Sequence, residues 1–311
     1  MPESLRDTVA RVTPQPTIAA ITAQLNSNYG RQKTFVIVEG QDDVDFYRKF
    51  FKGSTVCDVY ASVKEIKNSD GKAYLPGGKN YLRDIVKFII NKWTDKIIGI
   101  TDYDDYRFIP SHQFPQNVFP TDHRDLEMTA LDTQHAKAAL NAIDTTLKDK
   151  LNENEQPLRM LGLMRVCSKI FDLGLDFKNI KFTKIVDQNA CVNGVRQLKA
   201  DWEDILSNLF WQEFTRYKKG KKIQHNGLKY KLLVVCWLIT TNNLNADSYD
   251  LCQGHDTMGM LAYRYSDEKL HSQKNIKNAV LNSYDIKDFH ASQLYKTIQK
   301  WQSIHNVNIL K

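Results

Sequence analysis

The stretch FVIVEGQDDVDFY, from Phe35 to Tyr47, decides the fold class of this chain. Its first four residues are apolar and rich in β-branched side chains, which predicts a short buried strand. Glu39-Gly40 ends that run, and the residues from Asp42 to Phe51 have the pattern of a helix. A buried strand that leads at once into a helix is typical of a parallel sheet, so this stretch predicts an α/β domain.

The alternation of strands and helices continues to about Leu131. Further strands are predicted at Ser54–Tyr60, Lys72–Leu75, Lys96–Thr101 and Asn117–Phe119, and a further helix at Lys79–Trp93. This rhythm predicts a mainly parallel sheet with helices on both faces.

The chain after Thr133 is mostly helical in pattern. The predicted helices are Thr133–Thr145, Glu155–Leu173, Asn193–Asn208, Leu228–Thr240, Thr257–Ser266 and Ala291–His305, with a strand considered at Asn179–Val186. We therefore expect a helical lead-in over residues 1–31 with a helix at Thr17–Ser27, an α/β domain over 32–145, and a helical domain over 146–311.

Composition narrows the class of protein. The chain has 311 residues, 42% of them apolar and 25% charged, which is typical of a soluble globular protein. The longest apolar run, Leu232–Ile239, is too short for a membrane span, and the N-terminus has no apolar signal segment. The five cysteines form no CxxC pair and no zinc-like cluster, so we expect reduced cysteines and a cytoplasmic protein without a membrane partner.

Acidic residues follow two of the predicted strands. Glu39 follows the first, and Asp102 and Asp104 follow Lys96–Thr101, with their side chains on one side of an extended segment. Further acids lie nearby in sequence, at Asp42, Asp43, Asp122, Asp125 and Glu127. Because open parallel sheets place their chemistry at the carboxyl ends of strands, we expect a site for Mg²⁺ there. One or two such ions would serve phosphoryl chemistry on a nucleic acid or nucleotide.

Each of these signals also has a structural interpretation. A DxD motif alone is weak, and Asp42 and Asp43 suit the first turn of a helix, where the helix dipole favours acids. Gly77-Gly78-Lys79 precedes a predicted helix and could let an anion approach the backbone, or could be an ordinary turn. Lys79 is a candidate to contact a phosphate or an ion-bound acid.

The charge of the chain, +7 in total, is concentrated in one segment. Between Arg216 and Lys231 there is no acid, and the candidate nucleic-acid-binding residues are Arg216, Lys218, Lys219, Lys221, Lys222, Lys229 and Lys231. Such a patch suits a polyanion, because neutralising phosphates releases counterions. His225 and Lys229 lie where the patch meets an apolar helix, so they are candidates to assist catalysis. A solvated loop is the other interpretation.

Three motifs together resemble the Toprim domain that topoisomerases, primases and several nucleases share. They are VEGQDD at Val38–Asp43, GGK at Gly77–Lys79 and TDYDD at Thr101–Asp105. The resemblance covers about residues 34 to 131 and implies a Rossmann-like sheet. It also implies that Glu39, Asp102 and Asp104 bind Mg²⁺ and carry phosphodiester chemistry, with Glu39 as ligand or general acid–base.

The continuation DHRDLE at Asp122–Glu127 resembles the small stand-alone Toprim nucleases related to the overcoming-lysogenization-defect (OLD) type. That resemblance implies extra ligands for a second ion, first Glu127, then Asp43 and Asp125, with Mn²⁺ as a substitute metal. It also implies a separate ABC-type ATPase partner, because no Walker A motif is present. The Toprim effectors of PARIS-type anti-phage systems share this arrangement, and they imply an active homodimer that cuts host transfer RNA.

Two other classes of function stay open at this point. The chain could be a DNA-nicking or DNA-degrading enzyme, since nothing in its composition separates RNA from DNA. It could also be a non-catalytic nucleic-acid-binding subunit whose acids hold a structural metal. A Ser/His/Asp hydrolase is poorly supported, because no GxSxG motif is present.

Overall fold

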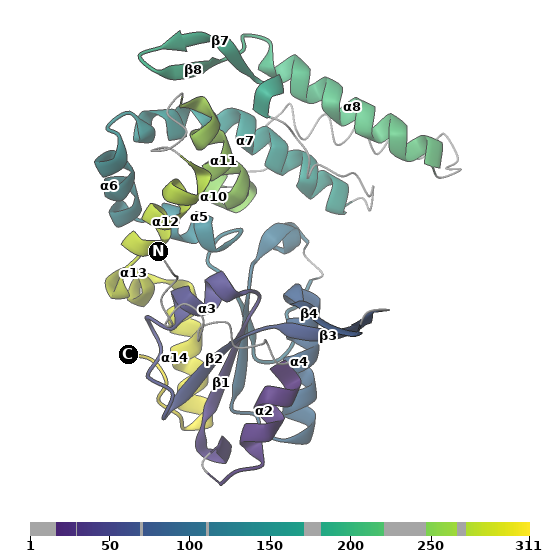
Figure 1. The fold of residues 1–311 in the computed structure, drawn as a ribbon, viewed down its shortest axis with the longest axis vertical. Coiled ribbons are helices and arrows are strands. Elements are labelled where there is room, and N and C mark those ends of the chain that lie inside the picture. Colours follow the sequence, from purple (N-terminus) through teal and green to yellow (C-terminus); the bar gives the residue numbers. More distant parts are fainter. Residues whose placement is uncertain are drawn as a thin grey trace. The chain divides into compact units, whose positions relative to one another are not determined.

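The computed structural model describes residues 17–28, 30–68, 71–109, 112–170, 182–220, 247–265 and 272–311 (Figure 1). The chain divides into two compact units. Unit 1 comprises residues 1–101, 113–120 and 289–311, and unit 2 comprises residues 102–112 and 121–288. Each unit is therefore built from segments that are separated in the sequence.

Unit 1 is built on a four-stranded sheet in the order β2-β1-β5-β6. The strands are β1 (Thr34–Val38), β2 (Cys57–Ala61), β5 (Ile97–Thr101) and β6 (Val118–Pro120). All three pairings are parallel, and every residue of β1 and β5 is buried. Complete burial of both central strands explains why their sequences are apolar except for one threonine at an end of each. The predicted α/β class with a parallel sheet is confirmed.

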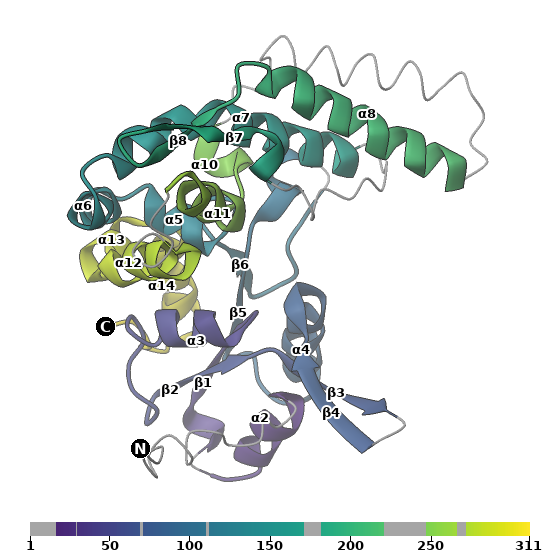
Figure 2. The same ribbon diagram turned by 45° about the horizontal axis from the view of Figure 1, so that its top comes forward.

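Helices cover both faces of this sheet. On one face, α2 (Thr17–Leu25) and α4 (Gly78–Lys92) pack their apolar side chains against those of β1, β5 and β6 in a single core cluster. Figures 1 and 2 show α3 (Gln41–Tyr47) and α14 (Gln293–His305) on the other side of the sheet. After α14 the chain returns to the segment that follows α3, where Leu310 forms an antiparallel bridge with Phe51.

The predicted strand Lys72–Leu75 is not part of the parallel sheet. Lys72–Leu75 lies within β4 (Gly71–Pro76), which pairs antiparallel with β3 (Val63–Asn68) in a separate two-stranded sheet. The prediction that it joins the parallel sheet was wrong. The alternation of apolar and polar residues identifies a strand but not its neighbour, and here the neighbour is the segment immediately before it.

Unit 2 consists mainly of helices. They are α5 (Leu126–Leu131), α6 (Gln134–Ile143), α7 (Leu147–Ile170), α8 (Trp202–Gly220), α10 (Ser248–Leu251), α11 (Gly254–Arg264) and α12 (Gln273–Ser283), followed by α13 (Ile286–Ala291), which runs across the division between the units. Short 3-10 helices occur at Asp104–Phe108 and Phe182–Lys184, and η1 (Gly30–Gln32) is a third, in unit 1. The long helix α7 begins eight residues before the predicted Glu155 and contains Pro157.

The predicted helix Asn193–Asn208 was wrong in its first half. Residues Val186–Val192 and Val195–Leu198 form the antiparallel hairpin β7–β8, and helix α8 begins only at Trp202. The turn is Asn193-Gly194, and both residues have positive φ, 50° and 76°. That pair is the preferred turn of a two-residue hairpin, so the sequence did carry the signal.

Two further predictions fall partly or wholly outside what the structure describes. The helix Leu228–Thr240 lies entirely outside the described residues, as does the first part of the strand considered at Asn179–Val186. Across the described ranges, no helix is both long enough and apolar enough to cross a bilayer.

Candidate functional site

Glu39 lies at the carboxyl end of β1 and is half-buried there. Its Oε1 accepts a hydrogen bond of 2.5 Å from the hydroxyl of Thr101, the last residue of β5. Because β1 and β5 are parallel neighbours in the sheet, their carboxyl ends lie at the same edge. Thr101 was not predicted as a site residue. Its hydroxyl fixes the orientation of the Glu39 carboxylate, as an outer partner does for a metal ligand.

The turn before α4 closes onto the same part of unit 1. The buried Ser62 has its Oγ 3.1 Å from the backbone oxygen of Glu39 and 3.2 Å from that of Gly78. Gly77 has no room for a side chain, since a Cβ there would lie 2.3 Å from the Tyr81 ring, and Gly78 has a φ of 61°. Both glycines are therefore required by this turn. The predicted strand, glycine turn and helix are confirmed, and Lys79 lies half-buried in the first turn of α4.

The acids after Gly40 open helix α3. The Asp43 carboxylate accepts a hydrogen bond of 2.8 Å from the backbone amide of Gly40, which is the reciprocal half of a capping box. Asp42 is exposed in the same first turn. Helix capping thus gives Asp43 a structural reason for its position, which the sequence left as one of two interpretations.

In unit 2, Asp104 has an unusual backbone conformation. It is the second acid of the DxD motif, two residues after Asp102. Its φ is 50°, in the left-handed region that few residues other than glycine adopt. Its amide donates a hydrogen bond of 2.7 Å to the backbone oxygen of Arg124. Both aspartates are half-buried. Aspartate enters this region more readily than most residues because its side chain is short and polar, and strained backbone of this kind is concentrated at functional sites.

Arg124 is the buried cation of this acidic region, with a side chain only 1% exposed. Its guanidinium forms an ion pair of 2.6 Å with Asp105 and donates a hydrogen bond of 3.0 Å to the backbone oxygen of Leu251. A buried charge needs such partners. Arg124 therefore joins the segment after β5 to helix α10, a role that sequence reasoning did not assign to it.

Asp125 and Glu127 lie at the start of α5. The buried Asp125 accepts hydrogen bonds from the amides of Met128, at 2.9 Å, and Gly254, at 2.8 Å. Burial, followed by the neighbouring Glu127 charge, raises the pKa of Asp125 to about 7. Asp125 thus caps α5 and links it to the first turn of α11, which accounts for its position without a metal.

Glu127 is half-buried and forms an ion pair of 2.9 Å with Lys277 of α12. Gly254 lets α11 approach these acids closely, because a Cβ at that position would lie 2.3 Å from the Cβ of Glu127. Neither Lys277 nor Gly254 was predicted, since each lies more than 120 residues from Glu127 and carries no local motif.

His123 links an aspartate of α10 to the aspartate that ends α5. Its Nδ1 lies 2.9 Å from Asp250 and its Nε2 lies 3.2 Å from Asp132. Burial lowers the pKa of His123, but hydrogen bonds and charge attraction from the two aspartates outweigh it, so the pKa is raised overall. With both ring nitrogens facing carboxylates, this histidine stabilises the fold and has no nitrogen left to act as a base.

The basic segment lies mostly outside what the structure describes. The candidates Lys221, Lys222, His225, Lys229 and Lys231 are outside the described residues. Arg216, Lys218 and Lys219 lie in α8, where the structure describes the backbone but not these side chains. Their predicted contacts with nucleic acid stay predictions.

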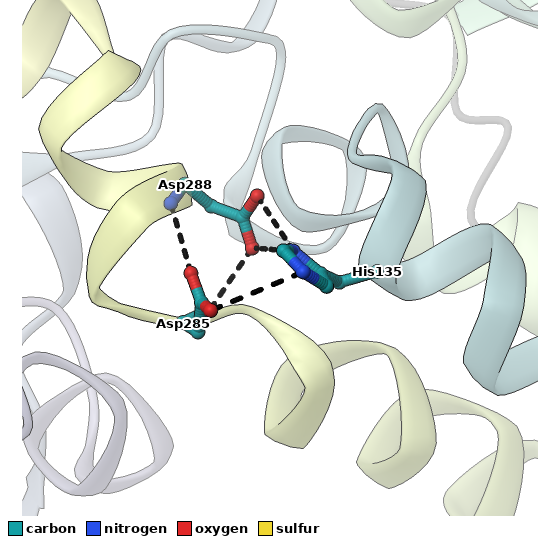
Figure 3. A group of neighbouring side chains, drawn as sticks. All are labelled: His135, Asp285 and Asp288. Carbon is teal, nitrogen blue, oxygen red and sulfur yellow. Dashed lines mark hydrogen bonds and ion pairs between the residues drawn. The ribbon is translucent and has the colours of Figure 1, made fainter.

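A histidine and two aspartates form a further group that could hold a metal ion: His135 of α6, with Asp285 and Asp288 at the start of α13 (Figure 3). His135 Nδ1 lies 2.9 Å from Asp288, which raises its pKa, chiefly through that hydrogen bond. Asp285 accepts hydrogen bonds from the amides of Lys287 and Asp288, and its own amide donates to Asp288. The cap hydrogen bonds at the start of α13, with the histidine paired to Asp288, give this group a structural role without a metal. The sequence analysis did not identify this group.

No protein-family model matches the chain, and no curated protein matches it either.

Proposed function

We propose that this protein is a Mg²⁺-dependent nuclease of the Toprim type that hydrolyses phosphodiester bonds in nucleic acid. The observation that carries the proposal is the hydrogen bond between Thr101 and Glu39 at the carboxyl ends of two parallel, fully buried strands. Asp102 follows Thr101 directly in the chain. Acids after two neighbouring strands are the arrangement that a metal-dependent α/β enzyme needs.

The donor set fits Mg²⁺. Glu39, Asp102 and Asp104 supply carboxylate oxygens only, which is the ligand type that this hard cation prefers. When bound, the ion would lower the pKa of an attacking water and neutralise charge on the phosphodiester. Lys79 would contact a phosphate oxygen. Glu127 would help to hold a second ion, in which case its partner Lys277 would have to exchange the carboxylate for another contact.

The substrate and partners follow from the resemblance to stand-alone Toprim nucleases. Transfer RNA is the substrate that we propose, and DNA is the alternative. A separate ATPase would hold the nuclease in check, and the active form would be a homodimer acting in the cytoplasm against phage infection. The net charge of +7 supports a polyanionic substrate without distinguishing RNA from DNA.

The test is a cleavage assay on purified protein with total transfer RNA and with plasmid DNA. Each substrate is incubated with Mg²⁺, with Mn²⁺ and with EDTA, beside the Glu39→Gln variant. We expect metal-dependent fragments of transfer RNA that the variant does not produce. Fragments of DNA alone would replace the RNA substrate by the DNA alternative. Intact RNA and DNA in every lane, both for the protein alone and for the protein co-expressed with an ATPase partner, would contradict the proposal.

A further inference from the structure

A pocket of about 280 Å³ lies in unit 1. It is formed by three segments of the chain: the end of helix α3 with Arg48, the turn before β2 with Lys52 and Ser54, and the last residue, Lys311. Its volume is just under the range of about 300–1,000 Å³ that is typical of sites for small ligands. Each of the three segments contributes a cationic side chain.

The side chains that line this pocket carry a net positive charge. Asp58 is the acidic side chain in its lining, and an ion pair of 2.9 Å with Lys33 already neutralises it. Within the described part of the chain, no carboxylate lies at ion-pair distance from Arg48, Lys52 or the Lys311 ammonium. Three cations around one cavity, none of them paired with a carboxylate of the described residues, favour an anionic ligand.

Backbone contacts hold these cations together. The amide of Lys52 donates a hydrogen bond of 2.7 Å to the backbone oxygen of Ile309, and the amide of Lys311 donates one of 3.0 Å to that of Phe50. The Lys311 ammonium also donates to the backbone oxygen of Arg48, at 3.3 Å. The final segment of the chain is thus fixed against α3 and the following turn, so the pocket is assembled before any ligand binds. Such preorganisation lowers the entropic cost of binding.

The position of the pocket separates it from the proposed metal site. Cys57, which lines it, is the first residue of β2 and pairs with Thr34, the first residue of β1. The pocket therefore lies at the amino end of the sheet, whereas Glu39 follows the carboxyl end of β1. Five residues of strand, roughly 16 Å, separate the two ends. A ligand here cannot be the scissile phosphate.

We propose that this pocket binds a phosphate group, carried either by a nucleotide or by the backbone of a nucleic acid. Arg48 and Lys52 bind the phosphate oxygens through charge-assisted hydrogen bonds. Lys311 adds a third cation, and the exposed turn at Gly53-Ser54 leaves the entrance open. The inference goes beyond the proposed nuclease and does not depend on its activity.

The experiment uses the full chain with Glu39→Gln and EDTA, so that neither cleavage nor the proposed metal site contributes. Binding of inorganic phosphate is followed by calorimetry against chloride at equal ionic strength, and binding of a ten-nucleotide oligouridylate without terminal phosphate by fluorescence anisotropy. The test variant is Arg48→Gln with Lys52→Gln. The matched control, Lys49→Gln with Lys87→Gln, removes the same number of positive charges, from two exposed side chains outside the pocket lining.

We expect the test variant to bind phosphate at least about tenfold more weakly than the parent, and the control to change by less than about twofold. A parallel loss of oligouridylate binding identifies a nucleic-acid backbone as the source, and unchanged oligouridylate binding identifies a nucleotide or free phosphate. Equal phosphate affinity in the test variant and the control would overturn the proposal. Ser54→Asp places a carboxylate on the exposed turn and should also abolish phosphate binding. Because it keeps Arg48 and Lys52, this variant tests the pocket independently if the double variant does not fold.

Discussion

The hydroxyl of Thr101 donates a 2.5 Å hydrogen bond to Glu39, joining two strand ends that lie 62 residues apart in the sequence. The bond ties the carboxylate to the last residue before Asp102. It also gives a buried hydroxyl at the end of β5 the partner that burial demands. The orientation of Glu39 therefore depends on a residue that carries no charge.

Replacing Thr101 tests that dependence. Thr101→Val keeps the shape of the side chain and removes the donor, so we expect metal-dependent cleavage to fall by about 10–100-fold. Thr101→Ser keeps the hydroxyl and should retain most of the activity. The measurement is the initial cleavage rate across a series of Mg²⁺ concentrations. Equal rates for the valine and serine variants would show that the hydrogen bond does not position Glu39.

Asp104 has a charged side chain and a backbone in the left-handed region. One substitution removes only the charge, and a second also strains the backbone. Asn also tolerates positive φ, so Asp104→Asn should leave the melting temperature nearly unchanged while metal-dependent cleavage is lost. Asp104→Val should destabilise the protein by about 1–2 kcal/mol, because a β-branched residue is strained at a φ of 50°. Urea denaturation measures the difference. A valine variant as stable as the asparagine variant would contradict the role of the backbone.

Gly254 permits the close contact between α11 and α5. A methyl group there would lie 2.3 Å from the Cβ of Glu127 and 2.7 Å from Oδ1 of Asp125, so Gly254→Ala should destabilise the protein by about 1–3 kcal/mol. Gly53→Ala is the control, since a Cβ at Gly53 meets nothing within 4 Å. Urea midpoints that shift equally for both variants would show that the contact is not tightly packed.

The His123 network predicts a pH dependence of stability. Its pKa is raised in the folded protein, so its contribution is complete below the unfolded pKa of about 6.5 and is lost as the pH rises through the folded value. His123→Gln should therefore lower the free energy of unfolding more at pH 5.5 than at pH 9. Urea titrations at both pH values give the comparison. A loss that is the same at both pH values would mean that folding does not shift the pKa of His123, which would contradict the network.

The sequence predicted the central sheet because its strands carry local signals. β1 and β5 are short, apolar and fully buried, and Glu39 and Asp102 follow them at positions that can be read directly. Helix α4 also begins within one residue of its predicted start, because Gly77-Gly78 marks the turn before it. Where burial and turn residues act within a few positions of one another, the sequence pattern is sufficient to predict the strand or helix.

Contacts between distant segments could not be predicted in the same way. Lys277 pairs with Glu127 and Gly254 donates to Asp125 because helices from far along the chain pack against α5, and no motif records that packing. The pairing of β4 with β3, instead of with the parallel sheet, could not be predicted from its local sequence either. The hairpin at Asn193-Gly194 is different, since its turn signal was present and was outweighed by the helical pattern that follows it.

The assignment of Glu39 as a metal ligand can be tested by Mn²⁺ binding, measured by electron paramagnetic resonance as the loss of the free-ion signal. Mn²⁺ substitutes for Mg²⁺ at carboxylate sites, and this measurement does not require the nuclease to be active. The proteins compared are the wild type, Glu39→Gln and the control Asp45→Asn, which removes an exposed acid from the helix that follows Glu39, α3. We predict that Glu39→Gln weakens binding at least about tenfold and that the control leaves it unchanged. Equal Mn²⁺ affinity in all three proteins would contradict the assignment of Glu39 as a metal ligand.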